Sequence, residues 1–138
     1  MSNIKLNKIF KTVCIASDHA GFNLKEFIKN YLISKKISIF DIGPNNDQSV
    51  DYPDYAKKLG TRIKLNKSDV GILVCGSGTG MAISANKIKT IRAAVCYNLK
   101  STRLSRQHNN ANIIALGSRL TNKKLSLKLV ETFLKTKF

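Results

Sequence analysis

The sequence predicts an α/β protein, a three-layer α/β/α sandwich around a five-stranded, parallel, Rossmann-like sheet. Five apolar runs recur along the chain and are almost continuously hydrophobic, which is typical of strands covered on both faces. Amphipathic stretches of helical period alternate with them, and this alternation favours a parallel sheet with helices on both sides. At 138 residues the chain is long enough to bury the core of one domain.

The expected elements follow one another in regular order. Strands are predicted at residues 12–17, 37–42, 70–75, 91–96 and 112–116. Helices are predicted at residues 22–34, 55–65, 81–88, 99–107 and 122–134. In the first helix, for example, Leu24, Phe27 and Ile28 share one side, as helical spacing requires.

The N-terminal segment, residues 1–11, is polar and basic and lacks the apolar core of a signal peptide, so we expect a short extension. No apolar run approaches the ~18 residues that a membrane span needs. The sequence therefore predicts a cytoplasmic protein without a membrane partner.

The net charge of +16 raises the question of a nucleic-acid partner. Lys outnumbers Arg by 19 to 5 and Asn and Ile are abundant, a composition typical of AT-rich genomes. The lysines are scattered, and no RNA-binding sheet motif or zinc-finger spacing occurs. The sequence therefore does not favour a nucleic-acid partner, despite the positive charge.

The carboxylates are distributed unevenly. None lies between residues 70 and 130, although that segment holds ten Lys and Arg. Such a region suits an anionic ligand. A base acting there would be Cys75 or His108, or would come from earlier in the chain.

The three cysteines differ in their surroundings, and they have neither disulfide parity nor metal-ligand spacing. Cys14 and Cys96 lie within apolar runs and are expected to be small buried hydrophobes. Cys75 ends a strand and adjoins a glycine-rich loop. It is a candidate nucleophile or base, with an ordinary core cysteine as the alternative.

The glycine-rich loop after Cys75 has the pattern Gly76-x-Gly78-x-Gly80. It is not a P-loop, because no Gly-Lys-Ser/Thr follows, and it is one residue short of a dinucleotide fingerprint. Closely spaced backbone N–H groups before a helix suit a small oxyanion or phosphate. A tight strand–helix packing turn is the alternative.

Other polar residues follow the first and last strands: Asp18 and His19 after residues 12–17, and Arg119 after residues 112–116. Ligands of open α/β sheets bind beyond the carboxyl ends of the strands, where these residues should meet. Three of the polar candidates have a purely structural alternative. Asp18 can cap a helix, His108 can complement a helix end, and Arg119 can be a solvated surface residue.

Seven segments occur together in the order found in sugar-phosphate isomerases. They are ASDHAG at 16–21, DYPDY at 51–55, GILVCGSGTGM at 71–81, ANK at 85–87, IRAA at 91–94, SRQHNNAN at 105–112 and ALGSR at 115–119. From about residue 13 to residue 138 the chain resembles the type B ribose-5-phosphate isomerases. Galactose-6-phosphate and allose-6-phosphate isomerases are close relatives of that family. The resemblance implies one sugar-phosphate isomerase domain over residues 1–138.

The function implied by the resemblance is a cofactor-free aldose–ketose isomerase of the pentose phosphate pathway, which uses no metal. It would interconvert ribose 5-phosphate and ribulose 5-phosphate through a cis-enediolate. Two alternatives stay open. One is the isomerisation of a six-carbon sugar phosphate such as allose or galactose 6-phosphate, and the other is a non-catalytic phosphosugar- or nucleic-acid-binding protein.

The resemblance assigns the glycine loop to the substrate. Ser77 would form an oxyanion cradle with the N–H groups of Gly76, Gly78 and Gly80, and Thr79 would also contact the substrate.

Cys75 would be the base that moves the proton. Some relatives carry a glutamate where Met81 stands, and methionine cannot abstract a proton, which strengthens the case for Cys75. His108 would assist ring opening, with Asn109 beside it.

The remaining implied roles concern the sugar and its phosphate. Asp18 would hold the sugar hydroxyls and Tyr52 would line the pocket, while His19 and Arg119 would contact the phosphate. The family builds its site between two subunits, so a homodimer, or a dimer of dimers, with shared active sites is expected.

The chain departs from the family pattern at its end. Relatives commonly continue past the last helix with a tail containing Arg and His, whereas this sequence stops at Phe138. We expect Arg119 and His19, with Arg103 or Arg106, to hold the phosphate instead. Weaker phosphate binding or a different sugar would follow.

Overall fold

Strands and helices alternate throughout residues 9–138, the part of the chain that the computed structural model describes. Residues 1–8 of the expected N-terminal extension lie outside the described residues. The strands are β1 (Val13–Ser17), β2 (Ile39–Gly43), β3 (Val70–Cys75), β4 (Ala93–Val95) and β5 (Ile113–Gly117). The helices are α1 (Phe22–Ser34), α2 (Tyr52–Lys64), α3 (Thr79–Asn86), α4 (Leu99–Gln107) and α5 (Lys123–Lys135).

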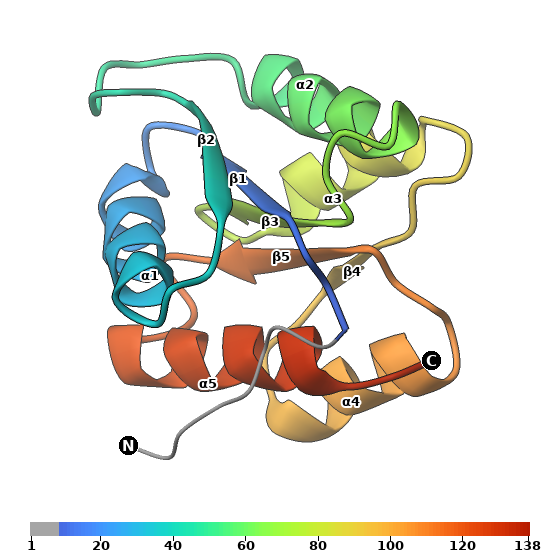
Figure 1. Ribbon diagram of the computed structural model, residues 1–138. Coiled ribbons are helices and arrows are strands. Elements are labelled where there is room, and N and C mark those ends of the chain that lie inside the picture. Colours follow the sequence, from blue (N-terminus) through green and yellow to red (C-terminus); the bar gives the residue numbers. More distant parts are fainter. Residues whose placement is uncertain (1–8) are drawn as a thin grey trace.

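The five strands form one sheet in the order β2-β1-β3-β5-β4, and every neighbouring pair is parallel. Helices α2 and α3 cover one face, and α1, α4 and α5 cover the other (Figure 1). This arrangement confirms the predicted three-layer α/β/α sandwich.

Side chains along each strand alternate between two cores, as the period of two in a strand requires. In β1, Val13 and Ile15 pack on the side of α1 and α5, whereas Cys14 and Ala16 pack on the side of α2 and α3. Strands β3 and β5 divide their side chains in the same way. The near-continuous apolar runs of the sequence therefore reflect burial on both faces.

Two helices begin earlier than predicted. Helix α2 starts at Tyr52 because Pro53 lies in its first turn, where a backbone N–H would lack an intrahelical acceptor in any case. Helix α3 starts at Thr79 because Gly78, with φ 81° and ψ −23°, turns the chain directly into the helix.

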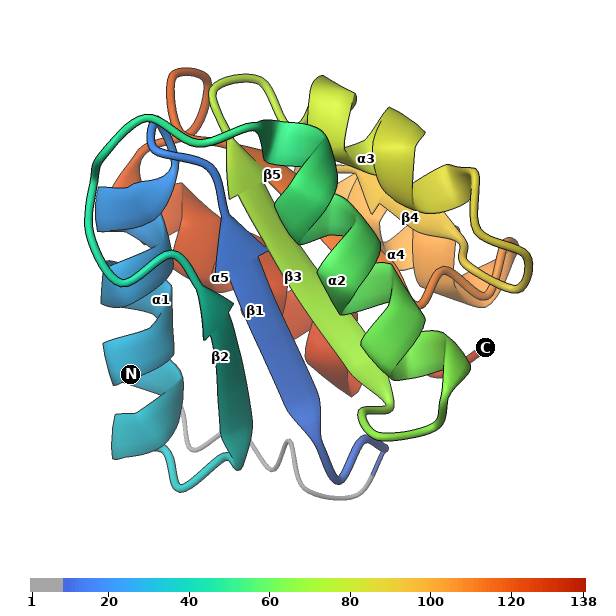
Figure 2. The same cartoon turned by 90° about the horizontal axis from the view of Figure 1, so that it is seen from above.

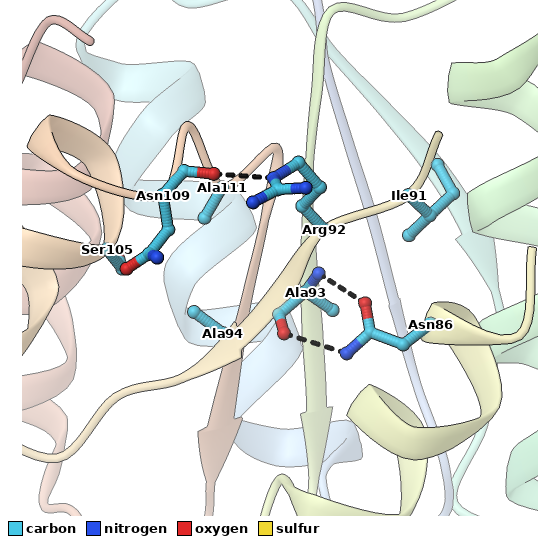
Figure 3. Close-up of a pocket in the computed structure, with 8 residues that line it drawn as sticks. All are labelled: Asn86, Ile91, Arg92, Ala93, Ala94, Ser105, Asn109 and Ala111. Atoms are coloured by element: carbon cyan, nitrogen blue, oxygen red, sulfur yellow. Dashed lines mark hydrogen bonds between the residues drawn. The ribbon is translucent and has the colours of Figure 1, made fainter. Parts of the chain in front are cut away.

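Strand β4 is shorter than predicted and forms an edge of the sheet. The side-chain amide of Asn86 accepts from the N–H of Ala93 at 2.7 Å and donates to its carbonyl oxygen at 3.0 Å (Figure 3). Asn86 thus takes the place of a neighbouring strand at this position and blunts the exposed edge.

The crossovers from β1 and β3 leave the sheet on opposite faces, through α1 and α3 respectively (Figure 2). In parallel sheets such a switch point opens a crevice at the carboxyl ends of the two strands, which is where ligands bind. No helix within residues 9–138 is both long enough and apolar enough to cross a bilayer.

Candidate active site

Cys75 stands at the carboxyl end of β3, at the start of the glycine loop. Its side chain is largely buried, with 5% of its surface exposed. The backbone N–H of Gly78 donates to the Cys75 Sγ at 3.1 Å. The hydrogen bond orients the sulfur at the end of the strand, and a cysteine acts as a base or nucleophile through this atom.

Gly78 needs its lack of a side chain to direct this N–H. Its φ of 81° is strained for other residues, and a Cβ would lie 3.0 Å from the backbone carbon of Leu116. The glycine loop is therefore a tight packing turn, which was the alternative interpretation, and it also supplies the N–H that binds the Cys75 sulfur.

Three loops join at this end of the sheet (Figure 2). The N–H of Ser118 donates to the carbonyl of Cys75 at 2.8 Å, and that of Arg119 donates to the carbonyl of Gly76 at 3.0 Å. The hydroxyl of Ser118 donates to the carbonyl of Ala20 at 2.9 Å. The loops after β1, β3 and β5 are thereby fixed to one another.

The glycines also admit two side chains to the site. A Cβ on Gly76 would lie 2.9 Å from the Arg119 Nη1, and one on Gly80 would lie 2.8 Å from the Tyr52 ring. The guanidinium and the phenol thus rest directly on the loop backbone.

Together these groups enclose a cleft of about 380 Å³. It is lined by Asp18, Tyr52, Cys75, Gly76, Ser77, Gly80, Arg119 and Leu120. The structure therefore brings together seven of the residues singled out in the sequence, from the end of β3, the loops after β1, β3 and β5, and the first turns of α2 and α3.

Asp18 has two roles in the structure. Its Oδ1 accepts from the N–H of Gly21 at 2.9 Å, which fixes the entry to α1 much as the capping alternative supposed. The side chain is buried and also lines the cleft, so the carboxylate is available to a ligand there.

His19, the next residue in the loop after β1, is exposed. Its Nδ1 accepts from the N–H of Val50 at 3.3 Å. In the neutral imidazole the proton therefore sits on Nε2, which is left as a donor for an anion.

Ser77 and Thr79 are exposed at the mouth of the loop. The Ser77 Oγ accepts from the N–H of Thr79 at 3.2 Å. Of the three glycine N–H groups expected to form an oxyanion cradle, that of Gly78 is directed at sulfur. The N–H of Gly80 lies in the first turn of α3, where the helix supplies no acceptor.

Tyr97 and Leu120 also belong to the site, although the sequence patterns did not predict them. The Tyr97 hydroxyl donates to the carbonyl of Ser77 at 3.0 Å, and Leu120 lines the cleft. Both follow the carboxyl ends of strands, β4 and β5, so the rule that singled out Asp18 and Arg119 could have found them.

His108 and Asn109 lie at the opposite end of the strands from Cys75. They follow α4 and precede the amino end of β5, whereas Cys75 pairs with Gly117 at the carboxyl end of β5. The intervening strand spans roughly 15 Å. A single chain does not bring His108 to Cys75.

Asn109 instead lines a separate pocket beside the edge strand β4, with Asn86, Arg92 and Ser105 (Figure 3). The Arg92 Nε donates to the carbonyl oxygen of Asn109 and holds this turn in place.

Arg106 is not available to a phosphate, contrary to expectation. It is buried, and its guanidinium donates to the carbonyls of Thr136 and Ala111 and to the Oδ1 of Asn110. Its task is to hold the end of α5 against the α4–β5 turn. Arg103, on the same helix, is exposed.

The other two cysteines are fully buried in the two cores, as expected. Burial raises the pKa of the Cys14 thiol to about 11 and also raises the pKa of Cys96. Within residues 9–138, no three His, Cys, Asp or Glu side chains gather as a set of metal ligands.

A buried sulfur facing an N–H donor, beside a glycine loop, an arginine and a carboxylate, defines a class of protein. It is an α/β enzyme that moves a proton on a small, polar, anionic substrate. The Ribose/Galactose Isomerase family matches residues 13–138, and the chain belongs to this family.

Solved structures and curated relatives agree with this assignment. Ribose-5-phosphate isomerase B of Thermotoga maritima is 52% identical, with a TM-score of 0.91 over 92% of this chain and 88% of that one. The Mycoplasma genitalium enzyme, solved with bound ribulose 5-phosphate, is 42% identical, with a TM-score of 0.88 over 92% and 85%. Ribose-5-phosphate isomerase B of Escherichia coli is 39% identical over 90% of this chain and 83% of its own length.

Proposed function

We propose that this protein interconverts ribose 5-phosphate and ribulose 5-phosphate. The observation that carries the proposal is the Mycoplasma genitalium relative, which holds ribulose 5-phosphate in the same fold at 42% identity. The cleft at Cys75 supplies the groups that such a reaction needs. We expect the reaction to take place in the cytoplasm, because a charged sugar phosphate made there does not leave through the bilayer unaided.

Cys75 acts as the base. Its thiolate takes the proton from C2 of the open-chain aldose, and the electron pair of that C–H bond forms the C1–C2 double bond of an enediolate. The thiol then returns the proton to C1, while the C2 hydroxyl proton passes to the C1 oxygen and leaves the ketone at C2. The N–H of Gly78, 3.1 Å from the sulfur, orients the base in the cleft.

The glycine loop stabilises the charge that develops on the sugar oxygen. Ser77 and the N–H groups of Gly76 and Gly80 border the cleft beside Cys75. Preorganised donors of this kind stabilise an oxyanion more strongly in a desolvated cleft than in water.

Substrate binding falls to the residues around the loop. The Arg119 guanidinium and the Nε2 of His19 take the phosphate, because both donate and neither carries negative charge. Asp18 accepts from sugar hydroxyls, and Thr79 and the Tyr52 ring close the pocket.

A second copy of the chain completes the site. His108 and Asn109 lie at the amino ends of the strands, away from the cleft at Cys75, so they reach a reacting sugar only in the cleft of a neighbouring subunit. Two exposed apolar side chains lie at the cleft, which suits a surface covered by a partner: Leu120, 58% exposed, lines it, and Tyr97, 41% exposed, contacts the carbonyl of Ser77. We therefore expect a homodimer with two shared sites.

The central test is the Cys75→Ala variant, assayed for ketose formation from ribose 5-phosphate with EDTA present. Loss of the base should lower kcat by about 10³-fold or more. Cys96→Ala, which removes a buried thiol away from the cleft, should keep wild-type turnover. Wild-type turnover by folded Cys75→Ala would overturn the assignment of the base.

The preferred sugar is decided by comparing kcat/KM for ribose 5-phosphate, allose 6-phosphate and galactose 6-phosphate. The highest value for ribose 5-phosphate is expected. A higher value for a six-carbon substrate would replace the proposed substrate without changing the reaction. Binding without any turnover would instead favour a non-catalytic phosphosugar protein.

A further inference from the structure

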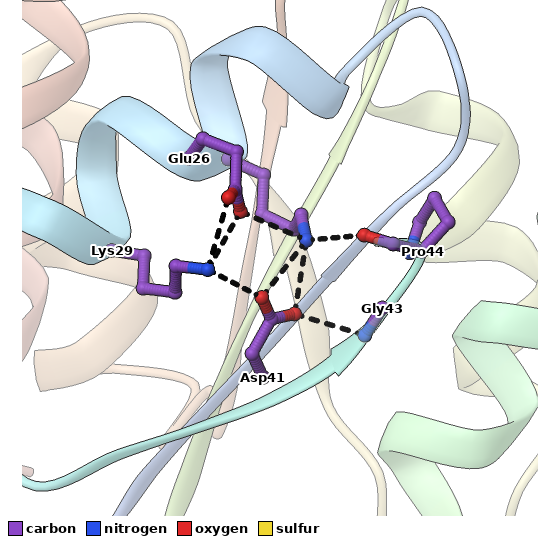
Figure 4. A network of polar contacts seen from close by, with 6 residues as sticks. Glu26, Lys29, Asp41, Gly43 and Pro44 are labelled. Carbon is purple, nitrogen blue, oxygen red and sulfur yellow. Dashed lines mark hydrogen bonds and ion pairs between the residues drawn. The ribbon is translucent and has the colours of Figure 1, made fainter. Parts of the chain in front are cut away.

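Lys25, in the first half of α1, is fully buried. Its Nζ lies 3.0 Å from each carboxylate oxygen of Asp41, 2.7 Å from the carbonyl oxygen of Pro44 and 3.2 Å from the Glu26 Oε2 (Figure 4). The proposed reaction gives this ammonium no role, and Lys25 does not line the cleft at Cys75.

A buried ion pair of this kind is poor evidence of stabilisation, since desolvation offsets much of the attraction. Burial alone would raise the pKa of the Asp41 carboxyl, but the hydrogen bonds and charges of Lys29 and Lys25 outweigh it and lower that pKa. The best-attested benefit of such networks is that they select one arrangement of the chain.

The arrangement selected here is the exit of the chain from β2. Lys25 holds the carbonyl of Pro44, the first residue after the strand, while the Asp41 Oδ1 accepts from the N–H of Gly43 at 2.9 Å. Gly43 has φ 119°, and a Cβ there would lie 3.1 Å from the Tyr55 ring. The Lys25 ammonium and the Asp41 carboxylate therefore fix the direction in which the chain leaves β2.

The segment that begins there, residues 44–51, leads to the cleft. The N–H of Val50 donates to the Nδ1 of His19, and the next residues place the Tyr52 ring against Gly80. Between these ends, residues 45–49 are exposed, and the one hydrogen bond seen within them is local, from the N–H of Gln48 to the Oδ1 of Asn46. Their course therefore depends on the anchors at either end.

We infer that Lys25 is a positioning residue for the substrate site. By holding Asp41 and the Pro44 carbonyl, it sets the course of residues 44–51 and so places His19 and Tyr52 against the sugar phosphate. The inference rests on the proposed isomerase function for its kinetic consequences, but not for its structural ones.

Lys25→Met is the test, and Lys29→Met is its matched control. Lys29 donates to the same carboxylate, at 2.8 Å from the Asp41 Oδ2, and pairs with Glu26, but the hydrogen bond to the Pro44 carbonyl comes from Lys25. Lys25→Met should raise the KM for ribose 5-phosphate about tenfold, with a smaller change in kcat, whereas Lys29→Met should leave KM unchanged.

The double variant Lys25→Met/Asp41→Asn distinguishes positioning from a purely structural role, because it removes the buried ammonium together with the carboxylate charge that it pairs with. Positioning predicts that the melting temperature recovers while KM stays high. A KM that returns to the wild-type value with the melting temperature would overturn the inference.

Hydrogen exchange gives a readout that does not depend on catalysis. The Val50 amide should exchange faster in Lys25→Met than in the wild type or in Lys29→Met. Inactivity of the wild-type protein would count against the proposed function alone. Unchanged Val50 exchange in folded Lys25→Met would refute the positioning role.

Discussion

The three cysteines differ in what their sulfur atoms face. The thiols of Cys14 and Cys96 are fully buried and lie 3.6 Å from the carbonyl oxygens of Val70 and Ala94, which stabilise the S–H form. The sulfur of Cys75 instead accepts an N–H and borders an open cleft. We therefore expect Cys14 and Cys96 to be unreactive and Cys75 to be the reactive cysteine.

Iodoacetamide at neutral pH should therefore alkylate Cys75 and leave the other two cysteines unmodified. The raised pKa of Cys14 and of Cys96 keeps both protonated, and the thiol is the unreactive form. Peptide mass spectrometry measures the sites directly, and ribulose 5-phosphate should slow the reaction. Equal modification of all three cysteines would contradict this assignment.

At the scale of elements, Arg106 ties three segments together. Its guanidinium donates to two carbonyls and one side-chain oxygen and lies 4.9 Å from the centre of the Phe10 ring. Arg106→Met would leave the buried Ala111 carbonyl and two partly buried acceptors without this donor, and we expect the free energy of unfolding to fall by about 2–4 kcal/mol.

Arg103→Met on the exposed side of the same helix is the control, and its effect should stay within about 0.5 kcal/mol. Urea unfolding of both variants makes the comparison. Similar losses for the two variants would mean that the buried contacts of Arg106 contribute little.

The sequence predicted the order and type of all ten elements because burial on two faces and helical periodicity are local patterns. It could not show how His108 would reach Cys75, since a loop between a helix and the next parallel strand lies at the amino ends of the strands, away from the carboxyl end of β3. Lys25 was not predicted either, because a lysine in an amphipathic helix is normally solvated, and its half-buried partner Asp41 comes from strand β2, far from it in the sequence pattern.

For the whole molecule, the buried thiols predict sensitivity to alkali. The folded-state pKa of Cys14 is about 11, above the ordinary 9.0, so its contribution to stability is complete below about pH 9 and is lost as pH rises through 11. The free energy of unfolding should decline over this range in the wild type. Cys14→Val should show a shallower decline, and an equally steep one would assign the effect to other groups.

The proposed shared site would be a property of two molecules, and complementation tests it. Cys75→Ala and His108→Ala should each be inactive alone as homodimers. Unfolded together and refolded, they form mixed dimers in which one site combines the intact Cys75 of one subunit with the intact His108 of the other. Half of the dimers are mixed and each has one working site of two, so about a quarter of wild-type activity should return. If both residues acted within one chain, every mixed dimer would have two defective sites and no activity would return. The recovery of activity therefore measures directly whether catalysis crosses the interface.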